Sequence, residues 1–312
     1  MSRYFDFEKD IEKVENQINE LDSNDLNFTL DKNKLLEKKN NLLKKIYSNL
    51  SPWQKVQVAR HINRPHSIDY INLIFQNITY LHGDKKFSDD SAVIGCLASL
   101  SGQSVMIIGT EKGNSMESRL KHNFGMAKPE GYRKAQRLMI LADKFNLPII
   151  TFVDTAGAFP GKEAEERGQS ESIASSILTS LKIESPIISI VIGEGGSGGA
   201  IALATADRIL MLEHSIYSVI SPEGCASILW RSSDFIQKAS ENLKLTAKDC
   251  LNYKIIDSII EEIPGGAHRF PEEQSIIIKK ELISNLESLK IIPREEKRKN
   301  RNNKFLNITS NI

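Results

Sequence analysis

Two stretches of the sequence repeat one order: an apolar strand, a glycine-rich turn and a helix. The first has the strand 148–154 and the turn 155–161, and the second has the strand 186–192 and the turn 193–199. Since both strands are apolar throughout, we expect them to be buried on both faces of a parallel sheet. The repeat fits one open sheet or stacked sheets that wind into a spiral, and the pattern alone does not distinguish them.

The same alternation of strands and helices extends over most of the chain and predicts an α/β domain over residues 51–290. Short apolar runs indicate the strands, and helical spacing of apolar residues indicates the helices. The further predicted strands are 93–100, 105–109, 208–212 and 216–220, and the predicted helices are 130–146, 163–181 and 197–206.

Residues 1–50 differ from this domain, because they contain no glycine and many Lys, Glu and Asn residues. Apolar residues recur at helical spacing from Phe7 to Leu21 and again from Leu35 to Leu50, on either side of a polar break at 22–25. We therefore predict a helical hairpin whose apolar stripes cover either the main domain or another subunit.

Charge gives little support for a nucleic-acid partner. Lys and Arg total 41 against 40 Asp and Glu, so the net charge is +1 and no global field attracts an anionic polymer or membrane. Residues 291–312 are charged and rich in asparagine, and they predict a flexible tail. The basic residues of this tail have only Phe305 as a neighbouring aromatic, which disfavours single-strand binding.

The three cysteines, Cys96, Cys225 and Cys250, are far apart and form no Cys-x-x-Cys pair. We expect reduced thiols and no structural metal site. The first ten residues turn acidic and polar at once, unlike a signal peptide, and the apolar runs are too short to span a bilayer. These features predict a soluble, cytoplasmic protein.

The turn 193–199 has five glycines in seven residues and leads directly into a helix. Glycine lets the backbone approach a ligand closely, and the first amides of a helix have no intrahelical acceptor. Such a turn can stabilise an oxyanion without a charged side chain. The alternatives are a turn that only allows tight packing and a non-catalytic scaffold.

Three other motifs compete for this turn. No lysine stands where a phosphate-binding Walker loop requires one, and Glu213 gives only a partial match to a dinucleotide fingerprint. The sharpest rival is a hydrolase nucleophile elbow, because Ser197 lies in a Gly-x-Ser-x-Gly sequence. Asp234 or Asp257, followed by His268, would complete the triad in the order of the α/β-hydrolases.

Asp154 ends the first apolar strand. A carboxylate there could act as a ligand or a base, but it more often accepts hydrogen bonds from the amides of the turn that follows it. We therefore favour a capping role for Asp154.

Seven segments in order resemble the alpha subunits of acetyl-CoA carboxylase carboxyltransferases over nearly the whole chain. No single segment would be specific, but the set is. The segments are 59–71 (ARHINRPHSIDYI), 123–139 (NFGMAKPEGYRKAQRLM), 148–161 (PIITFVDTAGAFPG), 164–174 (AEERGQSESIA), 191–203 (VIGEGGSGGAIAL), 217–230 (YSVISPEGCASILW) and 264–271 (PGGAHRFP).

The resemblance implies a crotonase-like spiral of ββα units with an N-terminal helical extension. It implies transfer of a carboxyl group from carboxybiotin, on the biotin carboxyl carrier protein, to acetyl-CoA, which gives malonyl-CoA for fatty-acid synthesis. It also implies an α2β2 assembly with a beta subunit that is required for activity. Biotin carboxylase would complete the larger complex and consume the ATP.

The resemblance assigns the oxyanion hole for biotin to the backbone N–H groups of Gly198 and Gly199, with Gly195 and Gly196 shaping the approach. The thioester enolate is assigned to the beta subunit. The departing ureido nitrogen of biotin can take the acetyl proton, so no protein base is required.

The other turn would line the substrate site through Ala156, Gly157, Phe159 and Gly161. The family usually has Asp-Thr-Pro-Gly-Ala-Tyr here, whereas this chain has Ala156 and Phe159. It therefore lacks the fixed φ of proline and the tyrosine hydroxyl.

Overall fold

A sheet with the strand order β1-β2-β3-β4-β5-β6-β8 organises the computed structural model, which describes residues 4–22 and 28–308. Among the described residues, β7 stands outside this strand order and pairs with β5. The strands are β1 (Gln76–Tyr80), β2 (Val93–Leu100), β3 (Gln103–Thr110), β4 (Ile149–Thr155), β5 (Ile187–Gly196), β6 (Arg208–Leu212), β7 (Ile216–Ser218) and β8 (Ser258–Ile260).

The strands from β3 to β8 pair in parallel, and β1, β2 and β3 pair in antiparallel fashion. β4 is buried along its whole length and β5 along all but its last residue, which confirms the expectation from their apolar runs. Ser101 and Gly102, both with positive φ, form the tight turn between β2 and β3.

β5 divides the sheet. Its first half, 188–191, pairs with β6, whereas its second half, 194–196, pairs with β7. One edge of β5 therefore pairs with β6 along its first half and with β7 along its second half, so β6 and β7 diverge at the carboxyl end of β5. This forked pairing, in place of one continuous partner along β5, is a feature that the sequence pattern did not specify.

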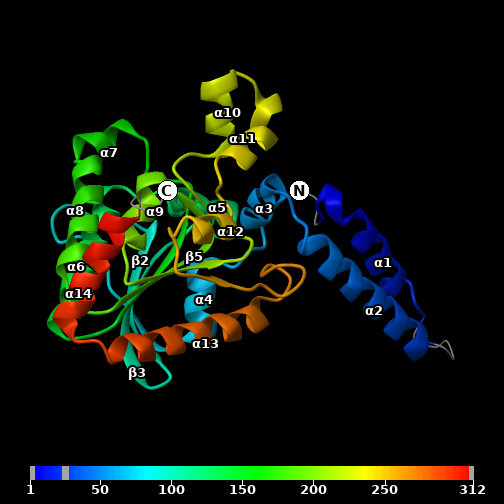
Figure 1. The fold of residues 1–312 in the computed structure, drawn as a ribbon, viewed down its shortest axis with the longest axis horizontal. Coiled ribbons are helices and arrows are strands. Elements are labelled where there is room, and N and C mark those ends of the chain that lie inside the picture. Colours follow the sequence, from blue (N-terminus) through cyan, green and yellow to red (C-terminus); the bar gives the residue numbers. More distant parts are fainter. Residues whose placement is uncertain (1–3, 23–27, 309–312) are drawn as a thin grey trace.

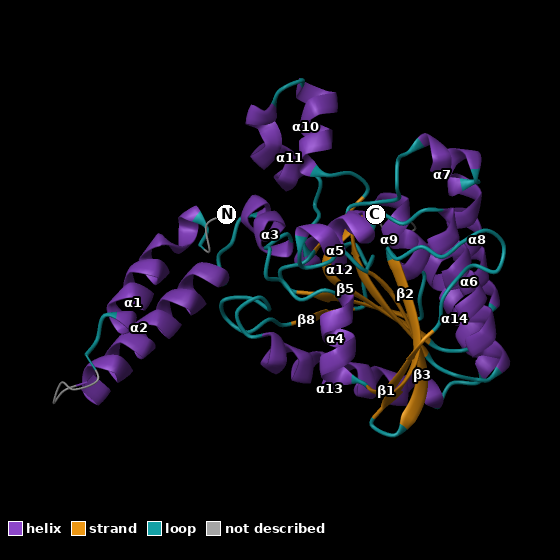
Figure 2. Cartoon of the chain, turned by 180° about the vertical axis from the view of Figure 1, so that it is seen from behind, coloured by secondary structure: helices purple, strands orange, loops and turns teal. Residues whose placement is uncertain are grey.

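Side chains of the central strands alternate between two cores. In β4, Ile149 and Val153 face one core, and Ile150 and Phe152 face the other. Helices α6 (Pro129–Lys144), α8 (Gln169–Lys182), α9 (Ser197–Ala204) and α12 (Ala247–Asn252) contribute to the first core; α4 (Ser67–Ile74) and α13 (Pro271–Lys290) contribute to the second. Figures 1 and 2 show α6 and α8 together on one side of the sheet.

The remaining helices are shorter or lie outside the two cores. Helices α10 (Pro222–Trp230) and α11 (Ile236–Asn242) project from the body beyond the carboxyl ends of the strands (Figures 1 and 2). Among the helices of the described residues, none combines the length and the apolar composition that a membrane span requires. The helices of this group are α3 (Pro52–Ala59), α5 (Met116–Lys121), α7 (Lys162–Glu166), α10 (Pro222–Trp230) and α11 (Ile236–Asn242), with short 3₁₀ turns at Asp6–Glu8, Asn123–Gly125 and Ser233–Phe235.

The predicted N-terminal helices are present as α1 (Lys9–Asn19) and α2 (Phe28–Tyr47), which lie side by side and extend away from the sheet (Figures 1 and 2). Residues 23–25 of the predicted polar break lie outside the described residues. Glu8 joins the pair to the main domain, because its carboxylate accepts hydrogen bonds from Arg269 and from the hydroxyl of Tyr47.

The predicted flexible tail is wrong for most of its length. Helix α14 (Arg294–Asn307) packs on the body, and Arg301 is buried in an ion pair of 2.7 Å with Asp207. The sequence suggested a solvated segment because it is highly charged, but several of these charges face carboxylates of the main domain. Residues 309–312 lie outside the described part, and the domain boundaries at residues 50 and 290 stay predictions.

Replacing Arg301 tests this packing. Arg301→Met should lower the free energy of unfolding by about 3–5 kcal/mol, because it leaves the Asp207 carboxylate buried without its partner. The half-exposed pair of Arg298 and Glu184, on the same helix, provides the matched control: Arg298→Met should change stability by less than about 1 kcal/mol. Equal urea midpoints for the two variants would contradict a structural role for α14.

Candidate active site

The two glycine turns lie back to back. β4 and β5 are parallel neighbours, so both turns leave the sheet at the same edge. A Cβ atom on Gly196 would lie 2.2 Å from the carbonyl oxygen of Ala156, and one on Gly199 would lie 2.7 Å from the carbonyl carbon of Gly157. Real Cβ atoms do not approach backbone so closely, and only glycine fits at both positions.

Helix α9 begins immediately after β5, without a connecting loop. Ser197 makes this turn possible by adopting a positive φ of 53°, which is uncommon for a residue other than glycine. No side chain caps the helix at Gly196. Gly198 and Gly199 stand in the first turn of α9, where the backbone N–H groups have no acceptor within the helix. The helix therefore presents free N–H groups at its positive end.

The two amides differ in surroundings. Gly198 is half-buried, and a Cβ there would only contact Ile173, at 3.5 Å. Gly199 is buried, and a Cβ there would lie 2.9 Å from the hydroxyl of Tyr132. That hydroxyl is buried without a hydrogen-bond partner in the described part of the chain. Burial raises the pKa of Tyr132 above its ordinary value, so the hydroxyl stays protonated beside the helix start.

The other glycines that were predicted to shape the site have structural roles, one within the sheet and one in the first turn. Gly195 lies within the sheet, paired with Thr155 on one side and Tyr217 on the other. Gly157 has a φ of 147°, and its N–H donates to the Thr155 hydroxyl at 3.1 Å. Ala156, at the tip of the same turn, is exposed.

Phe159 and Gly161 form the outer part of the first turn. The amide of Phe159 donates to Ala127 at 3.0 Å, and the Lys128 ammonium lies 4.8 Å from the centre of its ring. Gly161 precedes α7, and a Cβ there would lie 2.3 Å from the same ring. The phenylalanine ring therefore packs over Gly161.

A buried carboxylate, Asp154, holds the ends of three neighbouring segments. It accepts hydrogen bonds from the amide of Glu194 at 2.9 Å and from Nδ1 of His66 at 2.7 Å, and it pairs with Lys112 at 2.8 Å. Burial alone would raise the pKa of Asp154, but the charges of Lys112 and His66 hold it well below its ordinary value. The predicted cap of its own turn is wrong: among the described residues, the amide that donates to Asp154 is that of Glu194 on β5, and none of residues 155–161 does so.

Glu194 extends this network to two helices. Its carboxylate pairs with Lys112 at 3.2 Å and accepts from Nε of Arg60, which follows α3, at 3.0 Å. Arg60 also reaches Glu223 of α10 at 2.6 Å. Burial raises the pKa of Glu194, but Lys112 and Arg60 lower it further than burial raises it.

Arg60, His66 and Lys112 are members of this site that the sequence pattern did not reveal. Arg60 and His66 do lie in the segment 59–71 that carries the family resemblance, which was the available signal. Lys112 lies in none of the seven segments, and nothing in its local pattern distinguishes it.

The hydrolase alternative is wrong. Asp257 caps the amide of Ile209 and pairs with Lys304, and Asp234 hydrogen-bonds with Ser232. His268 stacks on His61 with ring centres 4.0 Å apart, and its ring nitrogens have no hydrogen-bond partner among the described residues. The side chains that would activate Ser197 are therefore not assembled.

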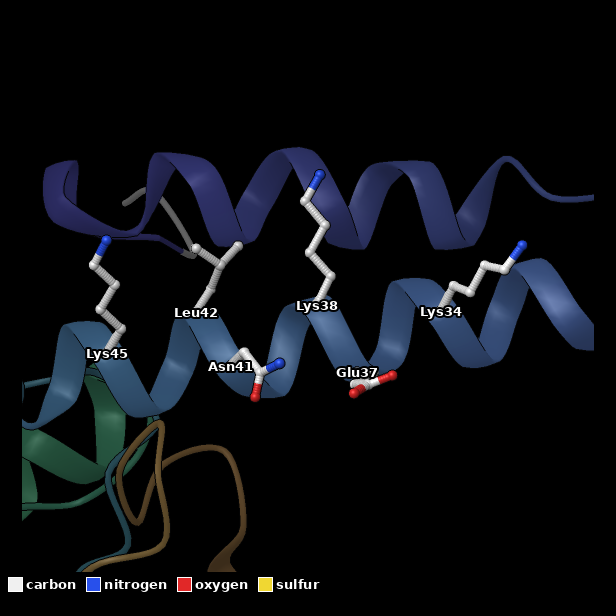
Figure 3. Close-up of a pocket in the computed structure, with 6 residues that line it drawn as sticks. All are labelled: Lys34, Glu37, Lys38, Asn41, Leu42 and Lys45. Atoms are coloured by element: carbon white, nitrogen blue, oxygen red, sulfur yellow. The ribbon is translucent and has the colours of Figure 1, made fainter.

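Another hollow, of about 470 Å³, lies along α2, and no residue of the two turns lines it (Figure 3). Lysines dominate its lining, and Figure 3 shows them spaced along one helix without convergence on a point. Within the described residues, no group of three or more His, Cys, Asp or Glu side chains could hold a metal ion.

Comparison with known proteins places this geometry in a family. Residues 4–309 match the model of the family described as acetyl co-enzyme A carboxylase carboxyltransferase-like. The acetyl-coenzyme A carboxylase carboxyl transferase subunit alpha of Rhodospirillum centenum is 53% identical over 98% of both chains, and that of Paramagnetospirillum magneticum is 54% identical over 96% of both.

Solved structures support the fold. The transcarboxylase 12S structure, with methylmalonyl-coenzyme A and methylmalonic acid bound, aligns with a TM-score of 0.56 at 20% identity. The alignment covers 76% of this chain and 46% of that one. At this identity the likeness concerns the fold alone, and it agrees with the expected crotonase-like spiral.

Acid titration tests the charge network. Because the pKa of Asp154 is lowered on folding, its ion pairs contribute stability that is present above the ordinary pKa of about 3.9 and is lost as pH falls through the folded value. At pH 7, Asp154→Asn should cost about 3–5 kcal/mol, since Lys112 loses a buried partner.

The difference in urea midpoint between wild type and Asp154→Asn should begin to shrink as pH falls through about 3.9 and should go on shrinking at lower pH, with a slope of about one proton. Glu163→Gln, at an exposed carboxylate on α7, is the control and should follow the wild type at each pH. A wild-type to Asp154→Asn difference that stays constant with pH would contradict the assignment.

Proposed function

The chain belongs to the acetyl co-enzyme A carboxylase carboxyltransferase-like family, and from that premise we propose that the amides at the start of α9 form the oxyanion hole for biotin. The chain acts as a carboxyltransferase subunit of acetyl-CoA carboxylase, a biotin-dependent enzyme of several subunits. The proposal concerns which of its atoms touch the reacting groups.

One observation carries the proposal: two backbone N–H groups of the first helical turn lie together at a partly exposed helix start that is built almost entirely of glycine. Gly198 and Gly199 supply the donors, and Gly196 allows the neighbouring turn to support them without a side chain between. Fixed donors of this kind stabilise a developing negative charge without reorganising at the moment of reaction.

Biotin fits these residues. Carboxyl transfer leaves negative charge on the ureido oxygen, and when bound the biotin ring supplies the carboxyl group. The amides of Gly198 and Gly199 would donate to that oxygen, and the missing side chains let the two turns hold these donors against one another. Ala156, exposed at the tip of the neighbouring turn, would lie beside the bound ring.

The reaction also creates a thioester enolate, which needs a second set of donors. We propose that a beta subunit provides them in an α2β2 assembly, and that biotin arrives on its carrier protein from a biotin carboxylase that uses ATP. The acceptor would be acetyl-CoA and the product malonyl-CoA. A reducing compartment such as the cytoplasm suits the three buried, unpaired cysteines, Cys96, Cys225 and Cys250.

Substitutions at the helix start distinguish a catalytic role of the glycine amides from a catalytic role of Ser197. Gly199→Val should lower turnover by at least 100-fold, the loss typical of one oxyanion donor, because its side chain would collide with the backbone of Gly157. Ser197→Ala should change turnover by less than about threefold, since its hydroxyl has no part in the mechanism. The assay is malonyl-CoA formation from a carboxylated biotin derivative with the beta subunit present.

A second glycine variant distinguishes loss of the oxyanion donor from loss of folding. Gly198→Ala should keep the wild-type urea midpoint, because its Cβ only contacts Ile173 at van der Waals distance, and it should still lower kcat by narrowing access to the amide. Wild-type kcat in both glycine variants would contradict the proposal. A loss of turnover in Ser197→Ala greater than that in the glycine variants would contradict it as well.

The division of the two oxyanion holes between subunits has its own test. The purified chain alone should form no malonyl-CoA, and addition of the beta subunit should restore the activity. Full activity of the chain by itself would show that it stabilises both anions.

A further inference from the structure

A pocket of about 200 Å³, lined by both charged and apolar side chains, borders the turn at Ala156, and the proposed mechanism does not use it. It lies among segments far apart in the sequence: the end of α3, the residue before α4, the loop after β3, α5 and the turn after β4. Three cations, Arg60, Lys112 and Arg119, line it against one carboxylate, Glu194.

His66 presents an unused nitrogen in the wall of this pocket. Its side chain is 6% exposed, and Nδ1 bonds Asp154, but Nε2 has no hydrogen-bond partner among the described residues. Burial lowers the pKa of His66, yet the hydrogen bond and charge of Asp154 raise it above its ordinary value overall. A charged imidazole has N–H groups on both nitrogens, and a buried donor without an acceptor is unfavourable.

Arg119 is the uncompensated cation of the pocket. Its Nε donates to the carbonyl of Gly113 at 3.1 Å, and no carboxylate in the described part of the chain pairs with its guanidinium. Arg60 and Lys112, by contrast, are both paired with Glu194. Arg60 and Lys112 therefore neutralise the charge of Glu194. The positive charge of Arg119 has no carboxylate partner among the described residues.

The backbone beside Arg119 is strained. Asn123 and Phe124 follow one another with φ values of 47° and 56°, and the ring of Phe124 lines the pocket. A left-handed conformation is tolerated by asparagine but is unusual for a bulky side chain such as that of Phe124. Such strain concentrates at ligand clamps and active sites.

We infer that this pocket is a subsite for an oxyanion, a carboxylate or phosphate group of a substrate, held by Nε2 of His66 and the guanidinium of Arg119. Arginine and a protonated histidine give strong, charge-assisted hydrogen bonds to both groups. The choice of source rests on the proposed function, because an acyl-CoA carries phosphates and the transferred group is a carboxylate. The anion site itself rests only on the pocket.

Calorimetric titration of the full chain at pH 7 with malonate, and separately with inorganic phosphate, tests the inference. At least one anion should bind saturably, and Arg119→Gln should weaken that binding by about tenfold or more, because a hydrogen bond to a charged group is lost. The control is Lys121→Gln, which removes the same charge from the same helix outside this pocket. It should change the Kd by less than about twofold.

Tighter binding of malonate would identify a carboxylate subsite, and tighter binding of phosphate would identify a phosphate subsite. The inference is overturned if neither anion binds saturably, if Arg119→Gln binds as the wild type does, or if Lys121→Gln weakens binding equally. Gly198→Ala should leave both titrations unchanged, since Gly198 does not line the pocket. A failure of the oxyanion-hole proposal therefore appears in turnover alone, and a failure of this inference appears in the titration alone.

Discussion

The contact on which the rest of the site depends is the approach of two backbones at the carboxyl edge of the sheet. Gly196 rests on the carbonyl of Ala156, and Gly199 rests on Gly157, at distances that exclude any side chain. Because the turns touch directly, α9 can start without a loop, and its first amides are held in place by neighbouring backbone. A site built of backbone donors has little freedom to reorganise, which suits stabilisation of a transient charge.

The buried ionic network explains how this edge keeps its geometry. Asp154 and Glu194 stand at the carboxyl ends of adjacent strands, where two carboxylates would repel, and Lys112 lies between them. Burying so many charges is unfavourable unless each is paired, and here each carboxylate has at least two partners. The network adds rigidity, and it leaves the neighbouring pocket with one free guanidinium and one free imidazole nitrogen.

Much of this architecture could be predicted from local pattern. The apolar runs gave the buried strands β4 and β5, helical spacing gave α6 and α8, and glycine density indicated both turns. The fork at β5 could not be predicted, because apolar periodicity reports that a residue is buried and not which strand it contacts. For the same reason the charged helix α14 was mistaken for a solvated tail. Arg60 and Glu194 are 134 positions apart, a distance that local pattern cannot bridge.

The central claim is that Gly198 and Gly199 donate hydrogen bonds to biotin, and glycine amide NMR measures this directly. A sample labelled with ¹⁵N only at glycine contains 18 such residues, and Gly198→Ala identifies one signal by its loss. On addition of a soluble biotin derivative to the complex with the beta subunit, the proton signals of Gly198 and Gly199 should move downfield, as expected for new hydrogen bonds. If these two signals stay in place while other glycine signals move, biotin binds elsewhere and the account is contradicted.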